Sequence, residues 1–164
     1  TTAWANHRKA HPGYDNILSF MNAATDALLF TQTFTVLAEA AGLGTCFLGT
    51  TVYMPQMIID TLHLPQLVMP VATLTVGWPD EKPAQTDRLP LRSIVHSEAF
   101  DDYTPEKIDD FYAEKEALEE NKEFVRTNQV ETLAQVFTDI RYTKKDCEAM
   151  STGFMEALRK QGFI

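Results

Sequence analysis

The sequence predicts an α+β fold in which a small mixed sheet is covered by helices and followed by a helical tail. A long, almost uncharged segment with helical spacing comes first, at 16–41. Two short runs rich in β-branched residues follow, at 45–52 and 67–78, with a short helical segment between them. Charged helical segments fill the rest of the chain. We expect one domain over 1–164, with 97–164 as its helical extension.

The first predicted helix, 16–41, is apolar around most of its circumference. Asp26 and Glu39 are its only charged residues. A helix of this kind must be buried on several sides. Because a chain of 164 residues has little other protein to surround it, we expect this helix to lie in an interface between subunits. Gly42, just past the last apolar position, predicts the end of the helix.

Two strands are predicted after this helix. The run 45–52 contains Gly49, which indicates a place where the backbone approaches another group closely. A short helix is expected over 54–62, with Pro55 in its first turn. The run 67–78 is almost continuously apolar, which favours a strand covered on both faces.

The helical tail follows a polar, proline-rich loop at 79–90. Thr104 and Pro105 predict a helix start, with threonine as N-cap and proline in the first turn. Residues 128–131 resemble a capping box that opens a short helix through Phe137. The last helix is expected over 144–161, ended by Gly162.

Composition excludes several classes of function. Fourteen Lys and Arg residues against 23 Asp and Glu give a net charge of −9, which opposes binding to nucleic acid or to an anionic membrane. Two cysteines are too few for a disulfide framework and fit a cytoplasmic protein. The sequence has no initiator Met, and we expect further residues to precede Thr1.

Two candidate sites have plainer interpretations. His7 and His11 have the spacing of metal ligands on a helix, but Pro12 follows and no third ligand is near, so a solvated pair is favoured. Cys46 could be a thiol nucleophile. It matches no nucleophile motif, and a small buried side chain is favoured. The glycines at 42, 44 and 49 are by themselves compatible with ordinary helix capping and strand packing.

The order of motifs along the chain resembles the FMN-dependent nitroreductase family, in its larger branch of oxygen-insensitive nitroreductases and flavin reductases. The similarity extends from about residue 15 to the end. The segments that carry it are 26–29, 38–49, 64–71, 75–79, 87–91, 94–96 and 160–163.

This resemblance implies an α/β sandwich formed by two intertwined subunits, with FMN bound at the interface of the homodimer. It implies an NAD(P)H-dependent oxidoreductase that reduces a small-molecule acceptor such as a nitroaromatic, a quinone or a flavin. Hydride would pass in two steps, from NADH or NADPH to the flavin and then to the acceptor. The cofactor would carry the redox chemistry, so no catalytic side chain and no metal are expected.

The cofactor-binding residues implied by the resemblance fall in two places. The stretch beside the flavin ring corresponds to Phe47, Leu48, Gly49 and Thr50, and the residue that meets the phosphate corresponds to Arg88. Thr86 stands where the family often has a lysine, and Lys82 is a candidate substitute. The family's arginine-rich N-terminal phosphate segment has no counterpart here. Two alternatives therefore stay open: a dimeric scaffold that binds flavin poorly, and a thiol enzyme that uses Cys46.

Overall fold

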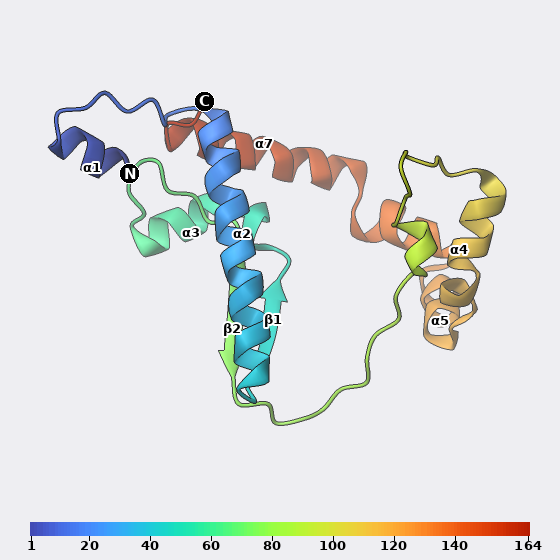
Figure 1. Ribbon diagram of the computed structural model, residues 1–164. Coiled ribbons are helices and arrows are strands. Elements are labelled where there is room, and N and C mark those ends of the chain that lie inside the picture. Colours follow the sequence, from blue (N-terminus) through green and yellow to red (C-terminus); the bar gives the residue numbers. More distant parts are fainter. The chain divides into compact units, whose positions relative to one another are not determined.

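A computed structural model describes every residue from Thr1 to Ile164. Contacts divide the chain into two compact units, one formed by 1–81 with 147–164 and the other by 82–146. Helices and strands follow the chain in Figure 1 as α1 (Thr2–His7), α2 (Ile17–Ala40), β1 (Gly44–Leu48), α3 (Pro55–Leu62), β2 (Thr73–Gly77), α4 (Pro105–Ala117), α5 (Glu119–Asn128), α6 (Leu133–Gln135) and α7 (Lys144–Lys160). Short 3₁₀ turns lie at Thr51–Tyr53 and Leu91–Ser93, and a π-helical segment follows α6 at Val136–Arg141. The extent of the predicted domain and of its 97–164 extension stays a prediction.

Helix α2 begins and ends where its local signals place it. The Asn16 side chain accepts a hydrogen bond from the Ser19 N–H at 2.9 Å, which satisfies a backbone donor that has no partner within the helix. At the other end Gly42 has a φ of 85°, a conformation that favours glycine. The Leu43 N–H then donates to Ala38 O at 3.0 Å and closes the last turn. The predicted helix is confirmed to within one residue at each end.

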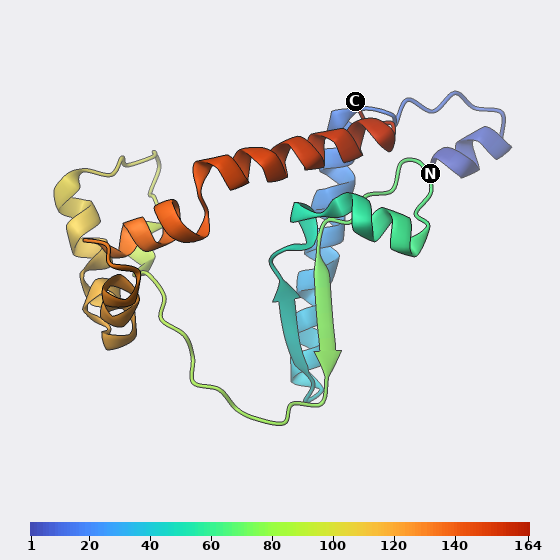
Figure 2. The same ribbon diagram turned by 180° about the vertical axis from the view of Figure 1, so that it is seen from behind.

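The sheet of the first unit is a two-stranded antiparallel hairpin. Strands β1 and β2 pair from Gly44 opposite Gly77 to Leu48 opposite Thr73. Helix α2 runs along one face of this hairpin, as Figure 1 shows, and the hydroxyl of Thr45 on β1 donates to Glu39 of α2 at 2.6 Å. The opposite face, turned forward in Figure 2, has no helix of this unit in front of it.

Strand β2 is shorter and more exposed than its sequence predicts. Only Thr73–Gly77 of the run 67–78 is extended in the sheet, and its last three residues are exposed. The expectation that this strand is covered on both faces is wrong within this chain. The earlier residues of the run, Leu67, Met69 and Val71, are apolar for a different reason, because they pack against the helical core of the unit.

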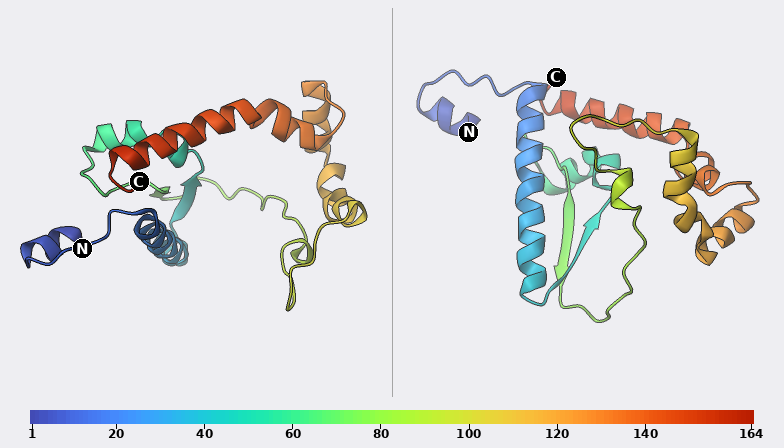
Figure 3. Two further views of the ribbon diagram at one scale, coloured as in Figure 1. Left: turned by 90° about the horizontal axis from the view of Figure 1, so that it is seen from above. Right: turned by 45° about the vertical axis from the view of Figure 1, so that its right-hand side comes forward.

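That core lies where the two ends of the unit meet. The rings of Phe20 on α2 and Phe163 near the C-terminus are 5.3 Å apart, and Leu158 of α7 is buried with them. The Leu67 N–H donates to Gln161 O at 2.9 Å, which fixes the chain after α7 against the loop that leads to β2. The left view of Figure 3 looks along α2 and shows the C-terminus beside the start of that helix.

The second unit is a helical cluster. The Thr104 side chain caps α4 by accepting from the Lys107 N–H, which confirms the predicted helix start. Beyond α5, the capping box is formed by Thr132 and Gln135, each side chain bonding to the other's backbone. The predicted box at 128–131 is wrong, because Asn128 is still the last residue of α5.

A pocket opens in this second unit. Its volume is about 720 Å³, and its wall is mainly apolar. Leu133 is buried beside it, and the Tyr103 hydroxyl donates to Ser93 O at 3.0 Å on another side. Lys115 of α4 also reaches this wall. Across the chain, none of the helices has the length and apolar character needed to span a lipid bilayer.

Candidate functional site

The four residues expected beside a flavin ring lie at the exposed end of β1. Phe47 and Leu48 are the last two strand residues, and Gly49 and Thr50 form the turn that follows. The side chains of Phe47 and Leu48 are 42% and 43% exposed. They give this end of the strand an apolar surface that is partly exposed to solvent.

A buried hydroxyl fixes the turn after β1. The Thr51 Oγ1 lies 3.1 Å from Leu48 O and 2.9 Å from the hydroxyl of Thr73 on β2. Because Thr51 is buried, these contacts are shielded from water and hold the turn in place. The stretch 47–50 is therefore presented on a fixed scaffold, which is what a ligand-binding backbone needs.

Gly49 has no reason within this chain to be a glycine. A Cβ built on it would have no other atom within 4 Å, and its φ lies outside the range that favours glycine. By contrast, a Cβ on Gly44 would lie 3.4 Å from the Cβ of Pro79. The close approach predicted at Gly49 is therefore not made by this chain's own atoms. The position fits a ligand or a second molecule that comes close to the backbone.

The backbone at this turn also has free donors. The N–H groups of Gly49 and Thr50 make no hydrogen bond to any backbone carbonyl. Two adjacent amide donors beside an exposed apolar surface can bind a flat ring that carries acceptor atoms at its edge, and they can stabilise negative charge there. The residues present therefore fit the ring of a flavin.

Arg88 belongs to the second unit, in the extended segment that precedes α4. Its Nη1 donates to Asp87 O at 2.9 Å, to Thr86 O at 3.3 Å and to the Thr86 hydroxyl. Its Nη2 and Nε have no hydrogen-bond partner and face solvent with the rest of this exposed residue. Two free N–H groups on one guanidinium fit two oxygens of a phosphate. That Arg88 and the stretch 47–50 bind one ligand stays a prediction.

Asp87 is held by a lysine from α4. Its carboxylate lies 2.6 Å from Lys115 Nζ. The hydrogen bond from Lys115 keeps the pKa of Asp87 below its ordinary value, and the charges of Lys115 and Arg88 act in the same direction. The sequence did not indicate that Lys115 or Thr51 belongs to the site. No local pattern could have identified them, because their partners lie 28 and 22 residues away in the sequence.

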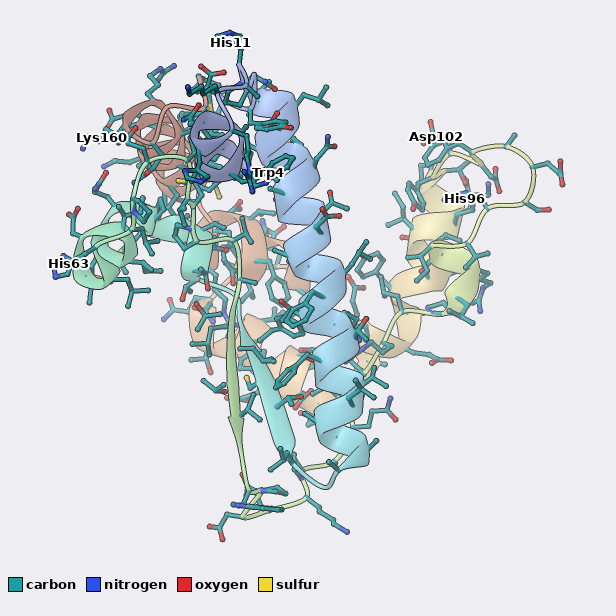
Figure 4. The ribbon with its side chains drawn as sticks, turned by 60° about the vertical axis from the view of Figure 1, so that its left-hand side comes forward. Trp4, His11, His63, His96, Asp102 and Lys160 are labelled. Atoms are coloured by element: carbon teal, nitrogen blue, oxygen red, sulfur yellow. The ribbon has the colours of Figure 1, made fainter.

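Neither alternative site gains support from the geometry. Cys46 is exposed, so the expectation that it packs in a core is wrong within this chain. The only described hydrogen bond of its thiol is to Phe47 O at 3.7 Å, and the thiol has no basic partner that would activate it. No three His, Cys, Asp or Glu side chains gather as metal ligands, and Figure 4 shows His11 and His63 at separate places on the first unit.

The outer surface of α2 is unusually apolar. One stripe of the helix, with Phe20, Thr35 and Ala38, is buried against the first unit. Large apolar side chains cover much of the remaining circumference and are exposed, namely Ile17, Leu18, Met21, Leu28, Leu29, Phe30, Phe34, Val36 and Leu37. An apolar surface of this extent on a water-facing helix is typical of a protein interface.

Several known proteins are similar to this chain. A solved structure described as an oxidoreductase from Bacteroides fragilis is 59% identical with a TM-score of 0.95, over 99% of this chain and 66% of that one. An FMN reductase (NAD(P)H) of Bacillus subtilis is 37% identical over 82 residues, which are 50% of this chain and 33% of that protein. An oxygen-insensitive NADPH nitroreductase of Salmonella typhimurium is 31% identical over 75 residues, 46% of this chain and 31% of that protein. No protein-family model matches the sequence.

These matches cover about a third of the length of the two curated relatives and 66% of the Bacteroides protein. The shared fold extends along nearly the whole of this chain, and solved nitroreductase structures share it at lower identity. The predicted α+β fold and the resemblance stated from the motifs are both confirmed. The chain belongs to the nitroreductase family.

Proposed function

We propose that this chain is part of an FMN-dependent NAD(P)H oxidoreductase that acts as a homodimer in the cytoplasm. Its acceptors would be nitroaromatics, quinones or free flavins, reduced by hydride transfer in two steps. The observation that carries the proposal is the turn after β1, where a glycine that the chain itself does not require stands beside two free amide donors. Relatives named FMN reductase and NADPH nitroreductase support the same chemistry.

Each proposed site residue has a physical role. The amide N–H groups of Gly49 and Thr50 would donate to acceptor atoms on the ring edge, and the side chains of Phe47 and Leu48 would exclude water beside it. Arg88 would bind the phosphate through its free Nη2 and Nε groups. A bound FMN would supply the hydride chemistry, which no side chain of the protein can perform.

The exposed surface of α2 is the proposed contact with a second copy of the chain. A water-exposed array of leucines and phenylalanines costs free energy that burial in an interface recovers, at roughly 25 cal/mol for each Å² of apolar surface. Charge repulsion at this contact would be small, because the helix carries only Asp26 and Glu39. A homodimer would thus remove the apolar surface that the monomer leaves exposed.

The function is tested by reconstitution. Purified protein would be incubated with FMN, freed of excess ligand, and examined for the flavin absorbance bands and for NADH and NADPH oxidation with a quinone or a nitroaromatic. We expect bound flavin and acceptor-dependent oxidation. A folded, dimeric protein that retains no flavin would contradict the proposal and favour a scaffold without catalysis. A Cys46→Ser variant that loses activity while its flavin content is unchanged would instead favour a thiol mechanism.

The dimer is tested by a charge on α2. Phe30 is 72% exposed, and Phe30→Glu places a carboxylate on the proposed interface without disturbing the buried stripe. We expect sedimentation velocity to show a dimer for the unmodified protein and a monomer for this variant. Leu91→Glu is a matched control, because Leu91 is equally exposed but lies in the second unit. Identical behaviour of both variants would contradict the proposed interface.

A further inference from the structure

We propose that Thr86 and the Asp87–Lys115 ion pair are positioning residues, which hold the Arg88 guanidinium in the orientation that binds a flavin phosphate. This inference rests on the proposed function, because it assumes that Arg88 meets the phosphate of FMN. The new element is the set of contacts that holds Arg88 in place.

Arg88 is tied to its own loop through one of its nitrogens. Nη1 bonds to the carbonyl oxygens of Thr86 and Asp87 and to the Thr86 hydroxyl. Three acceptors on one nitrogen restrict the rotation of a long side chain that is otherwise exposed. The opposite edge of the guanidinium, with Nη2 and Nε, stays free and can donate two parallel hydrogen bonds to a phosphate.

The loop in turn is tied to a helix. Lys115 lies in the last turn of α4, and its Nζ bonds the carboxylate of Asp87 at 2.6 Å. Since the carbonyl of Asp87 is one of the acceptors that hold Arg88, a continuous chain of contacts leads from α4 to the guanidinium. Farther along the same segment Arg92 bonds Asp110 of α4 at 2.9 Å, so the Asp87–Lys115 pair is the contact that holds residue 87 itself.

The Asp87–Lys115 pair is also less exposed than the ion pairs of Arg92, Lys107 and Arg126. The two side chains are 27% and 29% exposed, against 35% and 73% for Lys107 and Asp101, the other lysine pair on α4. A pair that is partly shielded from water and salt holds its geometry better than a fully solvated one. The Lys107–Asp101 pair does not lead to Arg88 and provides a control of the same chemistry on the same helix.

The purely structural alternative is that the pair only closes the loop onto α4. The two ideas differ in their effect on ligand choice. General loosening of the loop would weaken the binding of any flavin, whereas misplacement of Arg88 would weaken only a flavin that carries a phosphate. The ratio of FMN affinity to riboflavin affinity therefore separates them, because riboflavin has the same ring and ribityl chain without the phosphate.

The experiment measures FMN and riboflavin affinity by quenching of flavin fluorescence in the full chain. The ratio of FMN affinity to riboflavin affinity is called the FMN preference. It should fall most in Arg88→Ala. We expect Lys115→Met and Thr86→Val each to lower that preference about 5- to 10-fold, the effect of losing roughly one ordinary hydrogen bond. Lys115→Arg should keep most of the FMN preference that Lys115→Met loses. Lys107→Met should leave the FMN preference unchanged. Circular dichroism confirms that each variant is folded.

The outcomes separate the positioning role of Thr86 and the Asp87–Lys115 pair from the proposed function. If Arg88→Ala lowers FMN preference but Lys115→Met and Thr86→Val do not, the positioning role is overturned and the proposed function stands. Equal loss of FMN and riboflavin affinity in those two variants, or the same shift in Lys107→Met, also overturns the positioning role. If the unmodified protein shows no preference for FMN, the phosphate role of Arg88 is wrong and this inference is wrong with it.

Discussion

The variant Gly49→Ala tests whether the glycine at position 49 is needed for ligand binding or for folding. The structure has open space where the new Cβ would lie, and the φ of Gly49 lies outside the left-handed range in which a side chain is strained. We therefore expect no loss of folding free energy. A gain of about 0.4–1 kcal/mol is expected instead, because alanine restricts the unfolded chain more than glycine does.

Gly162→Ala is the matched control. We expect it to lower the folding free energy and to leave flavin affinity unchanged. Gly162 has a φ of 80°, and a Cβ there would lie 3.3 Å from the Gln66 side-chain oxygen. An alanine in this left-handed conformation costs roughly 1–2 kcal/mol of folding free energy. The position lies after α7, next to the core residue Phe163 and apart from the stretch 47–50 in sequence, so it should not alter flavin affinity per folded molecule.

The assay combines urea unfolding with FMN titration. If the backbone at Gly49 lies against a flavin ring, a methyl group there pushes the ring away from the amide donors. We expect FMN affinity to fall at least 10-fold, which corresponds to about 1.4 kcal/mol. Variant and unmodified protein must be compared at concentrations where sedimentation shows the same oligomeric state. A Gly49→Ala protein that binds FMN as tightly as the original would refute the assignment of this turn to the cofactor.

Three further predictions concern stability. Leu158→Ala removes a buried core side chain and should cost about 2–5 kcal/mol in urea unfolding, while Met155→Ala on the exposed side of α7 should cost well under half as much. Thr132→Ala removes the capping box of α6 and should cost about 1 kcal/mol. The hydrogen bond and charge of Lys107 lower the pKa of Asp101 in the folded state from 3.8, so this pair stabilises the protein above the unfolded pKa and the effect is lost as the pH falls. Asp101→Asn should therefore flatten the decline of stability from about pH 5 downward in acid titrations followed by circular dichroism.

The sequence predicted the features that depend on neighbouring residues. Helix α2 starts at an asparagine that caps it and ends at Gly42, and both signals act within four residues. Thr104 and Pro105 marked the start of α4 for the same reason. The stretch 47–50 could be placed at a strand end because the β-branched run and its glycine are local. These predictions needed no knowledge of what packs against each segment.

Features that depend on distant contacts could not be predicted. Leu67 and Val71 look like strand residues because they are apolar, but their apolar character serves the core around Phe20 and Leu158. The capping box forms at Thr132 and Gln135 instead of at the predicted residues 128–131, because α5 extends through Asn128. The ion pair that ties the Arg88 loop to α4 joins residues far apart in sequence, and no spacing rule identifies such a pair.

The proposed dimer and the proposed cofactor site are expected to depend on each other. Helix α2 covers one face of the hairpin, and its outer surface is the proposed interface, while the stretch 47–50 ends the strand that this helix supports. A second copy packed on α2 would therefore stiffen the scaffold on which the Gly49 and Thr50 donors are held. Phe30→Glu on the exposed surface of α2 should then weaken FMN binding at the same time as it produces monomers. A monomeric variant with unchanged FMN affinity would show that the flavin site forms within one subunit, and the link between assembly and cofactor binding would be wrong.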